Sequence, residues 1–165
     1  MRRGNPALAV LLLAGCGYQL GEPSIAGVST VSIPMVKNLT LRRGNEFGAG
    51  GHEIDLTQAI RDRVLSETGY GLASVDTADL VAKVDLNEYS TPFLVEDKAD
   101  RPLVSNVTVR VKLVVQRRDG TVVYEGTREE TGHLVPSRDE DEAAARAEAF
   151  AAVARWVVGK LQGGW

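Results

Sequence analysis

The sequence has little cysteine and little histidine, and it has no long apolar run. Cysteine occurs once in 165 residues, at Cys16, and histidine twice, at His52 and His133. The only extended apolar stretch, residues 7–14, is too short to cross a bilayer, since a spanning helix takes roughly 20 apolar residues. The sequence therefore predicts neither an intramolecular disulfide nor a transmembrane helix.

A strong excess of one charge is also missing. The chain has 19 Lys and Arg against 22 Asp and Glu, a net charge of −3, and only 5% aromatic residues. Domains that bind nucleic acid broadly are usually basic, with clustered Lys and Arg. We therefore expect no nucleic-acid partner, and an anionic ligand would have to meet a local basic patch.

The residues before the single cysteine follow a recognisable order. Arg2 and Arg3 give a positive amino end, residues 7–14 are apolar, and residues 14–15 are small. That order is typical of a secretory signal peptide. The alternative, in which Cys16 is a small buried hydrophobe of a first strand or helix, leaves the order unexplained.

The segment Leu13-Ala14-Gly15-Cys16 resembles the lipobox of bacterial lipoproteins. The resemblance implies that residues 1–15 are a signal peptide, that Cys16 is acylated, and that cleavage leaves it as the first residue. Stable anchoring takes more than one lipid chain, which a triacylated cysteine would supply. No Asp follows the cysteine, so we expect a membrane-anchored protein on the periplasmic face of the outer membrane.

The rest of the chain is the size of one domain. Residues 16–165 number about 150, enough for one hydrophobic core. With Cys16 acylated, no cysteine remains for a disulfide or a thiolate metal site. We therefore expect a single domain without a cofactor, stabilised by its core alone.

Alternating apolar residues predict strands. Residues 25–36 form the first, and Pro34 should lie at a sheet edge or end it, because proline cannot donate to a ladder. Residues 80–90 and 103–116 alternate more strictly. An Asp119-Gly120 pair then predicts a hairpin into residues 121–131. The expected inward side chains are Leu80, Ala82, Val84, Leu86, Val107, Val109, Val111, Leu113 and Val115.

Two segments have helical periodicity. The first helix is predicted over residues 52–69 and should end near Gly69. The second should begin at the acidic residues 139–142, because carboxylates are stabilised at the positive end of a helix dipole. The first helix should bury Ile54, Ala59, Ile60, Val64 and Leu65. The second should bury Ala143, Ala147, Phe150, Ala154, Val157 and Leu161.

The order of strand, helix, strands and helix predicts an α+β fold. A sheet with one apolar face needs a cover, and two amphipathic helices provide it. We expect a two-layer sandwich, with a mostly antiparallel sheet of about four strands covered on one face by two helices.

No catalytic arrangement is visible. His52 and His133 are far apart and each lies beside glycine, so the interpretation we favour is that both are exposed loop residues. The glycines of residues 44–51 lack the Lys-Ser/Thr of a phosphate-binding loop. The sequence predicts neither an enzyme nor a metal site.

Basic residues collect in several inter-element segments. Lys98 and Arg101 lie between two strands, Arg117 and Arg118 in a turn, and Arg138 before the last helix. Solubility explains any one of them. Arginine is also well shaped for bidentate contact with phosphate, so several at one end of a sheet could bind a phosphorylated glycolipid.

Several stretches resemble the LPS-assembly lipoprotein LptE family. They are "LAGCGYQL" at the lipidation site, "VSIPMVKNLT", "LTQAIRDRVLSETGYGLAS", "ADLVAKVDLNEYS", the valine-rich strand with its "DG" turn, and the alanine-rich final helix. The glycine-rich insertion at residues 42–51 and the lack of a tail after the last helix depart from the pattern.

The resemblance implies a protein without enzymatic activity. Members of that family sit as a plug in the lumen of the β-barrel LptD, help it assemble, and bind lipopolysaccharide on its way to the outer leaflet. The family's basic ligand contacts match Lys98, Arg101 and Arg138 best. The alternative is an outer-membrane lipoprotein that serves as a structural or secretion-complex subunit without binding glycolipid.

Overall fold

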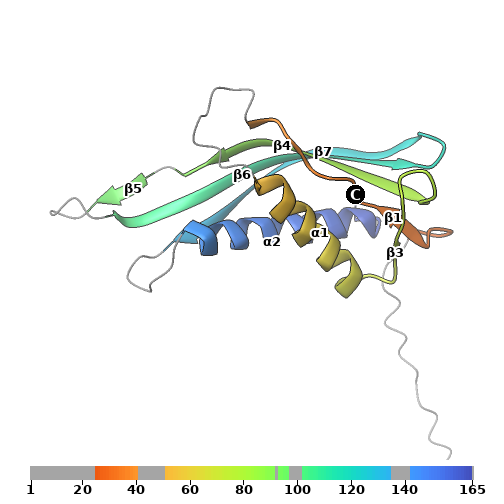
Figure 1. Cartoon of the computed structure of the whole chain (residues 1–165), viewed down its shortest axis with the longest axis horizontal. Helices are drawn as coiled ribbons and strands as arrows, with labels where there is room; N and C mark the ends of the chain where they lie inside the picture. The colour runs from red at the N-terminus through yellow and green to blue at the C-terminus, as the bar shows by residue number, and fades with distance from the viewer. Residues whose placement is uncertain (1–24, 41–50, 92, 97–101, 135–141, 165) are drawn as a thin grey trace, which may run out of the picture.

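The computed structural model describes residues 25–40, 51–91, 93–96, 102–134 and 142–164. Figure 1 shows α1 and α2 packed against one face of a long twisted sheet. The predicted α+β fold, with two helices covering one face of the sheet, is confirmed. In chain order the elements are β1 (Thr30–Ser32), β2 (Lys37–Asn38), α1 (His52–Glu67), β3 (Gly71–Leu72), β4 (Leu80–Ser90), β5 (Phe93–Glu96), β6 (Pro102–Arg117), β7 (Val122–Leu134) and α2 (Glu142–Leu161).

The sheet is organised around β6, which is antiparallel to β4, β5 and β7. On the far side of β4, the short strands β1 and β2 run parallel to it, and β3 runs parallel to β1. The described residues form seven strands, where the sequence predicted about four. The additional strands are β2, β3 and β5, which span only two to four residues, too few for alternation to show.

The alternating strands bury their predicted faces. All nine side chains expected to point inward on β4 and β6 are at most 3% exposed. β1 ends at Ser32, shortly before Pro34, as the proline predicted. The hairpin between β6 and β7 is also present, and Gly120 takes a positive φ of 86° in its turn.

The helices bury their predicted faces in part. Ile60, Val64, Phe150, Ala154, Val157 and Leu161 are buried as predicted. In α1, however, Ile54 and Leu65 are each 57% exposed, and Leu56 joins Ile60 and Val64 in a stripe at four-residue intervals. In α2, residues 143 and 147 are exposed, and the buried stripe begins at Ala145 and Ala149. Alanines occupy both candidate stripes of α2, so the sequence could not choose between them. No helix of the described residues is long and apolar enough to span a bilayer.

The two ends of the sheet differ. At one end, which we call the turn end, Leu72, Leu80, Arg117 and the Gly120 turn lie together. At the other, the loop end, β4 finishes at Ser90 and the pairing of Ser105 with Leu134 closes the described ladder between β6 and β7. Side chains near both ends form the candidate sites described next.

Candidate functional site

The residues predicted from sequence to carry function, Cys16, Lys98, Arg101 and Arg138, lie outside the described residues. Their roles therefore stay predictions. The backbone beside two of the segments is described: Pro102, which follows Arg101, starts β6, and Leu134 ends β7 opposite Ser105. These flanking residues lie at the loop end of the sheet.

A buried aromatic cluster lies near the loop end. The ring of His52, the first residue of α1, stacks on Tyr89 with centroids 4.1 Å apart and an angle of 20° between planes. The edge of Phe150 from α2 completes the cluster, with 6.4 Å between centroids. His52 is 3% exposed, so the prediction of an exposed loop histidine is wrong. The chain enters α1 through Gly51, whose φ of 115° suits glycine, and places the imidazole in the core.

Tyr89 reaches the cluster because β4 is irregular. The register with β6 shifts between Leu86 and Glu88, so inward positions change from even to odd numbers and Tyr89 faces the helices. Its hydroxyl donates a hydrogen bond of 2.7 Å to Oε1 of Glu142, the first residue of α2. Burial, together with this carboxylate, raises the pKa of the Tyr89 phenol. The contact joins the end of β4 to the start of α2, and no sequence pattern indicated it.

The cluster keeps His52 neutral. Burial lowers the pKa of the imidazole, and the nearby Arg146 cation lowers it further, against the opposing effects of Asp55, Glu142 and Glu53. Arg146 itself lies 3.7 Å from the carboxylate of Asp55 across the two helices. The imidazole is therefore an uncharged stacking partner at neutral pH.

A groove of about 210 Å³ runs between α1 and α2 beside this cluster. Alanines leave it open because their side chains are short, and Arg146 places a cation on its wall. The groove therefore has small apolar walls and one ion pair, between Arg146 and Asp55. It is lined by Asp55, Ala59, Ala143, Arg146, Ala147, Phe150 and Ala151.

The open face of the sheet, opposite the helices, is polar. Arg110 contacts Glu88 at 2.8 Å and Glu129 at 2.6 Å, and so bridges β4, β6 and β7. Lys112 pairs with Glu125 at 2.6 Å. These ion pairs join three carboxylates to two cations and give a polar surface that tolerates water or a polar partner.

Basic residues at the turn end have structural contacts. Arg118 contacts Oδ1 of Asp79 at 3.1 Å and donates to the carbonyls of Ala78 and Thr77. The other oxygen of Asp79 accepts hydrogen bonds from the backbone and hydroxyls of Ser29 and Thr30. These donors, led by the Ser29 backbone, lower the pKa of Asp79 to about 2. Arg118 is thus engaged in holding the turn end together.

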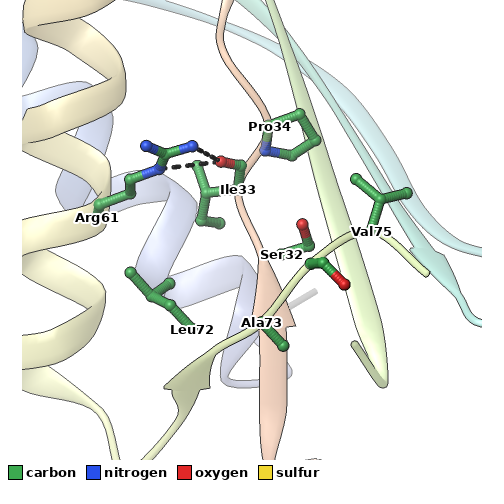
Figure 2. A pocket seen from close by; sticks show the side chains of 8 residues that line it. Ser32, Ile33, Pro34, Arg61, Leu72, Ala73 and Val75 are labelled. Atoms are coloured by element: carbon green, nitrogen blue, oxygen red, sulfur yellow. Dashed lines mark hydrogen bonds between the residues drawn. The ribbon is translucent and has the colours of Figure 1, made fainter. Parts of the chain in front are cut away.

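A hollow of about 490 Å³ lies beside β1 (Figure 2). Arg61 of α1 points at the carbonyl oxygen of Ile33, to which its Nε and Nη2 donate at 3.0 and 2.6 Å. The last residue pair between β1 and β3 is Val31 with Leu72, so Ile33 lies beyond that pairing. The Arg61 guanidinium supplies hydrogen bonds to its carbonyl there. Ser32, Pro34, Leu72, Ala73, Ser74 and Val75 complete the lining.

Among the described residues, no three side chains of His, Cys, Asp or Glu come together as a metal site requires. The prominent features of this part of the chain are the aromatic cluster, the groove and the polar open face.

Solved structures share this fold. A hypothetical protein of Chlamydia trachomatis superposes with a TM-score of 0.60 at 12% identity, covering 82% of this chain and 96% of that one. The uncharacterized lipoprotein B of Nitrosomonas europaea gives 0.56 at 7% identity, covering 83% and 84%. A protein of Xanthomonas campestris gives 0.53 at 13%, covering 86% and 87%.

Sequence comparisons add no relative. No protein-family model matches the chain, and no curated protein matches it. The identities to the solved structures are too low to carry function across. What this chain has in common with these bacterial proteins, one of them named a lipoprotein, is the fold.

Proposed function

We propose that the chain is a lipoprotein of the outer membrane, anchored through Cys16 on the periplasmic face and without enzymatic activity. The ordered features before Cys16 support the anchor. The shared fold with lipoprotein B of Nitrosomonas europaea agrees with it. The domain then works by binding, for which the groove and the open face provide surfaces.

The partner in this proposal is a β-barrel of the LptD type, which the domain plugs and helps to assemble. The observation that carries this step is the polar open face, where Arg110 and Lys112 are paired with acidic residues across β4, β6 and β7. The interior of a large transmembrane barrel is polar and wet, while its outside is apolar. A polar face of ion-paired side chains fits the first environment and would be unsuited to contact with acyl chains.

Lipopolysaccharide is the ligand in this proposal, with Lys98, Arg101 and Arg138 as contacts for its phosphates. Support comes from the loop end: β6 begins directly after Arg101, and α2 begins four positions after Arg138. Arg146 adds a cation in the nearby groove, where it also lies 3.7 Å from the carboxylate of Asp55.

The test is a pull-down of the tagged full-length chain from detergent-extracted membranes. We expect an outer-membrane β-barrel to copurify with the wild type and to be lost with Arg110→Glu/Lys112→Glu, which puts two negative charges in the middle of the open face. Arg155→Glu, an exposed charge on α2, is the matched control. Recovery of secretion subunits instead of a barrel would favour the structural alternative.

A further inference from the structure

The outer edge of β7 has no partner strand among the described residues. β7 runs for 13 residues and pairs with β6 on one side only. Its register with β6 is regular from Tyr124 to Leu134, without a bulge. It contains no proline. An unpaired strand of this length displays a row of backbone donors and acceptors that can receive another strand.

The groups that point outward can be identified. The backbone N–H of His133 donates to Oε2 of Glu148 at 2.8 Å, so it faces away from β6. Outward and inward groups alternate along an antiparallel strand. The residues at two-residue intervals before His133 therefore share its orientation, and we call their N–H and C=O groups the β7 edge. They are Glu125, Thr127, Glu129 and Thr131.

The β7 edge is accessible. Glu125, Thr127 and Glu129 are exposed, and Thr131 is half-buried. Within the described part of the chain, these four amides make no hydrogen bond outside the strand ladder. Both glutamates form ion pairs across to β6, Glu125 with Lys112 and Glu129 with Arg110.

A second copy of this chain is a poor occupant of the β7 edge. An antiparallel pairing of two copies about Thr127 would set Glu125 of each copy opposite Glu129 of the other. Like charges directly opposite one another destabilise a strand pair. The occupant is therefore a strand of a different sequence, without acidic side chains at these positions.

Charge identifies the occupant further. Glu125 and Glu129 lie on the open face beside the β7 edge, and together with Glu88 they are three carboxylates that share two cations, Arg110 and Lys112. On the helix side, Glu130 pairs with Arg128 at 2.7 Å. The excess along the strand is acidic. A neighbouring strand with basic side chains opposite the two open-face glutamates gains cross-strand ion pairs.

We propose that the β7 edge is a docking site for an extended segment of another protein, which adds as a further strand and carries two basic side chains four positions apart. Backbone hydrogen bonds give the affinity, and the spacing of Glu125 and Glu129 gives the selectivity. The proposal uses neither Cys16 nor the predicted glycolipid contacts, so its test is independent of theirs.

The probe is the synthetic peptide Thr-Lys-Thr-Val-Thr-Lys-Thr with a fluorophore, added to the full-length chain in detergent. We expect binding by fluorescence anisotropy and slower amide hydrogen exchange at the four residues of the β7 edge. Replacing both lysines by glutamate, or methylating alternate peptide nitrogens, should weaken binding about tenfold or more, because ion pairs or hydrogen bonds are lost.

On the protein, Thr127→Pro removes an outward N–H and leaves the ladder to β6 unaltered, since edge strands tolerate proline there. We expect it to abolish binding, while the matched Thr127→Ala keeps it. Circular dichroism confirms folding of both. Absence of binding to wild type, or equal binding by folded Thr127→Pro, would overturn the proposal. A dimer in solution that Thr127→Pro dissolves would overturn the choice of partner.

Discussion

His52 and Tyr89 stack with their ring centroids 4.1 Å apart, and through this contact the start of α1 is fixed to the end of β4. The Tyr89 hydroxyl extends the connection to Glu142 at the start of α2. The segments that carry the predicted ligand contacts adjoin these elements in sequence. The cluster is therefore placed to hold the scaffold of the loop end in a fixed arrangement.

Stability should depend on pH through His52. The pKa of the His52 imidazole is lowered in the folded chain. Above about pH 6.5 the imidazole is therefore neutral in both the folded and the unfolded state, and its protonation does not reduce the free energy of unfolding. As the pH falls below that value, the unfolded state binds a proton that the folded state resists, and stability falls by up to about 1.4 kcal/mol per pH unit. Urea unfolding between pH 8 and 5 measures this.

The control for this effect is the other histidine. His52→Phe keeps an aromatic ring in the stack and should remove the loss of stability between pH 6.5 and the onset of carboxylate titration. His133→Gln, at an exposed position of β7, should retain the wild-type profile. An unchanged profile in His52→Phe would mean that other groups control the pH response.

The close approach of α2 to β7 should make Gly132 intolerant of any side chain. In Gly132→Ala the new methyl would overlap the Ala145 carbonyl oxygen, which belongs to the helix backbone and cannot rotate away. We expect a loss of about 1–3 kcal/mol in the free energy of unfolding, typical of overpacking.

Gly159→Ala is the matched control, because a methyl there meets open space on α2. It should stabilise the chain by up to about 1 kcal/mol through helix propensity. Thermal unfolding of both variants measures the difference. If both alanines had the same effect, the helix would have to lie further from the strand than the structure shows.

The features that the sequence predicted correctly are those that follow a simple hydrophobic period. Val107 to Val115 alternate over a long strand with one buried face, and a shift of one residue would expose them all, so their orientation is strongly determined. Only the start of the α2 face was mistaken, because Ala143 and Ala147 fit a helical stripe as well as Ala145 and Ala149 do. The close passage over Gly132 selects the second stripe, and that is a tertiary contact.

The aromatic cluster could not be predicted for a similar reason. Tyr89 faces inward only because the register shifts after Leu86, whereas the regular alternation from Leu80 to Leu86, if continued, would place it outward. His52 stands beside glycine, a context typical of loops, and its burial depends on Tyr89 and Phe150 from distant parts of the chain. The segments of Lys98, Arg101 and Arg138 lie outside the described residues, so their prediction stands as made.

Asp79 should stabilise the turn end in its ionised form. The pKa of the Asp79 carboxyl is about 2 in the fold, against an ordinary value of 3.8. Its contribution to the free energy of unfolding is therefore fully present above pH 3.8 and is lost as the pH falls towards 2. Asp79→Asn should lower the urea midpoint at pH 7, and the difference from wild type should shrink at pH 2.5. Asp76→Asn, an exposed residue of the same loop, should have no such effect.

Lipidation of Cys16 is tested by mass spectrometry of membrane-extracted protein. We expect a mature chain that begins at acylated Cys16, because the thiol accepts the diacylglyceryl group. Cys16→Ser lacks that thiol and should no longer be held at the outer membrane. Detection of an intact, unmodified chain starting at Met1 in the wild type would contradict the anchor.

Arg101 and Arg138 should contact the phosphates of lipopolysaccharide. The backbone next to Arg101 begins β6, and the strand that leads towards Arg138 ends opposite Ser105, so both segments depart from the loop end. A charge-assisted hydrogen bond to phosphate contributes roughly 1.5–3 kcal/mol before solvent exposure weakens it. Arg101→Asp/Arg138→Asp should therefore weaken binding of purified lipopolysaccharide, more strongly at low salt, where charges are less screened.

Arg117→Asp provides the matched control, since Arg117 is an exposed arginine at the turn end, the opposite end of β6. It should bind lipopolysaccharide as the wild type does. Fold should survive in both variants, because none of the three arginines belongs to a predicted apolar face, and circular dichroism checks this. Equal binding by the folded double variant would show that Arg101 and Arg138 are surface charges only. A loss as large in Arg117→Asp would show that binding follows net charge and has no defined site at the loop end.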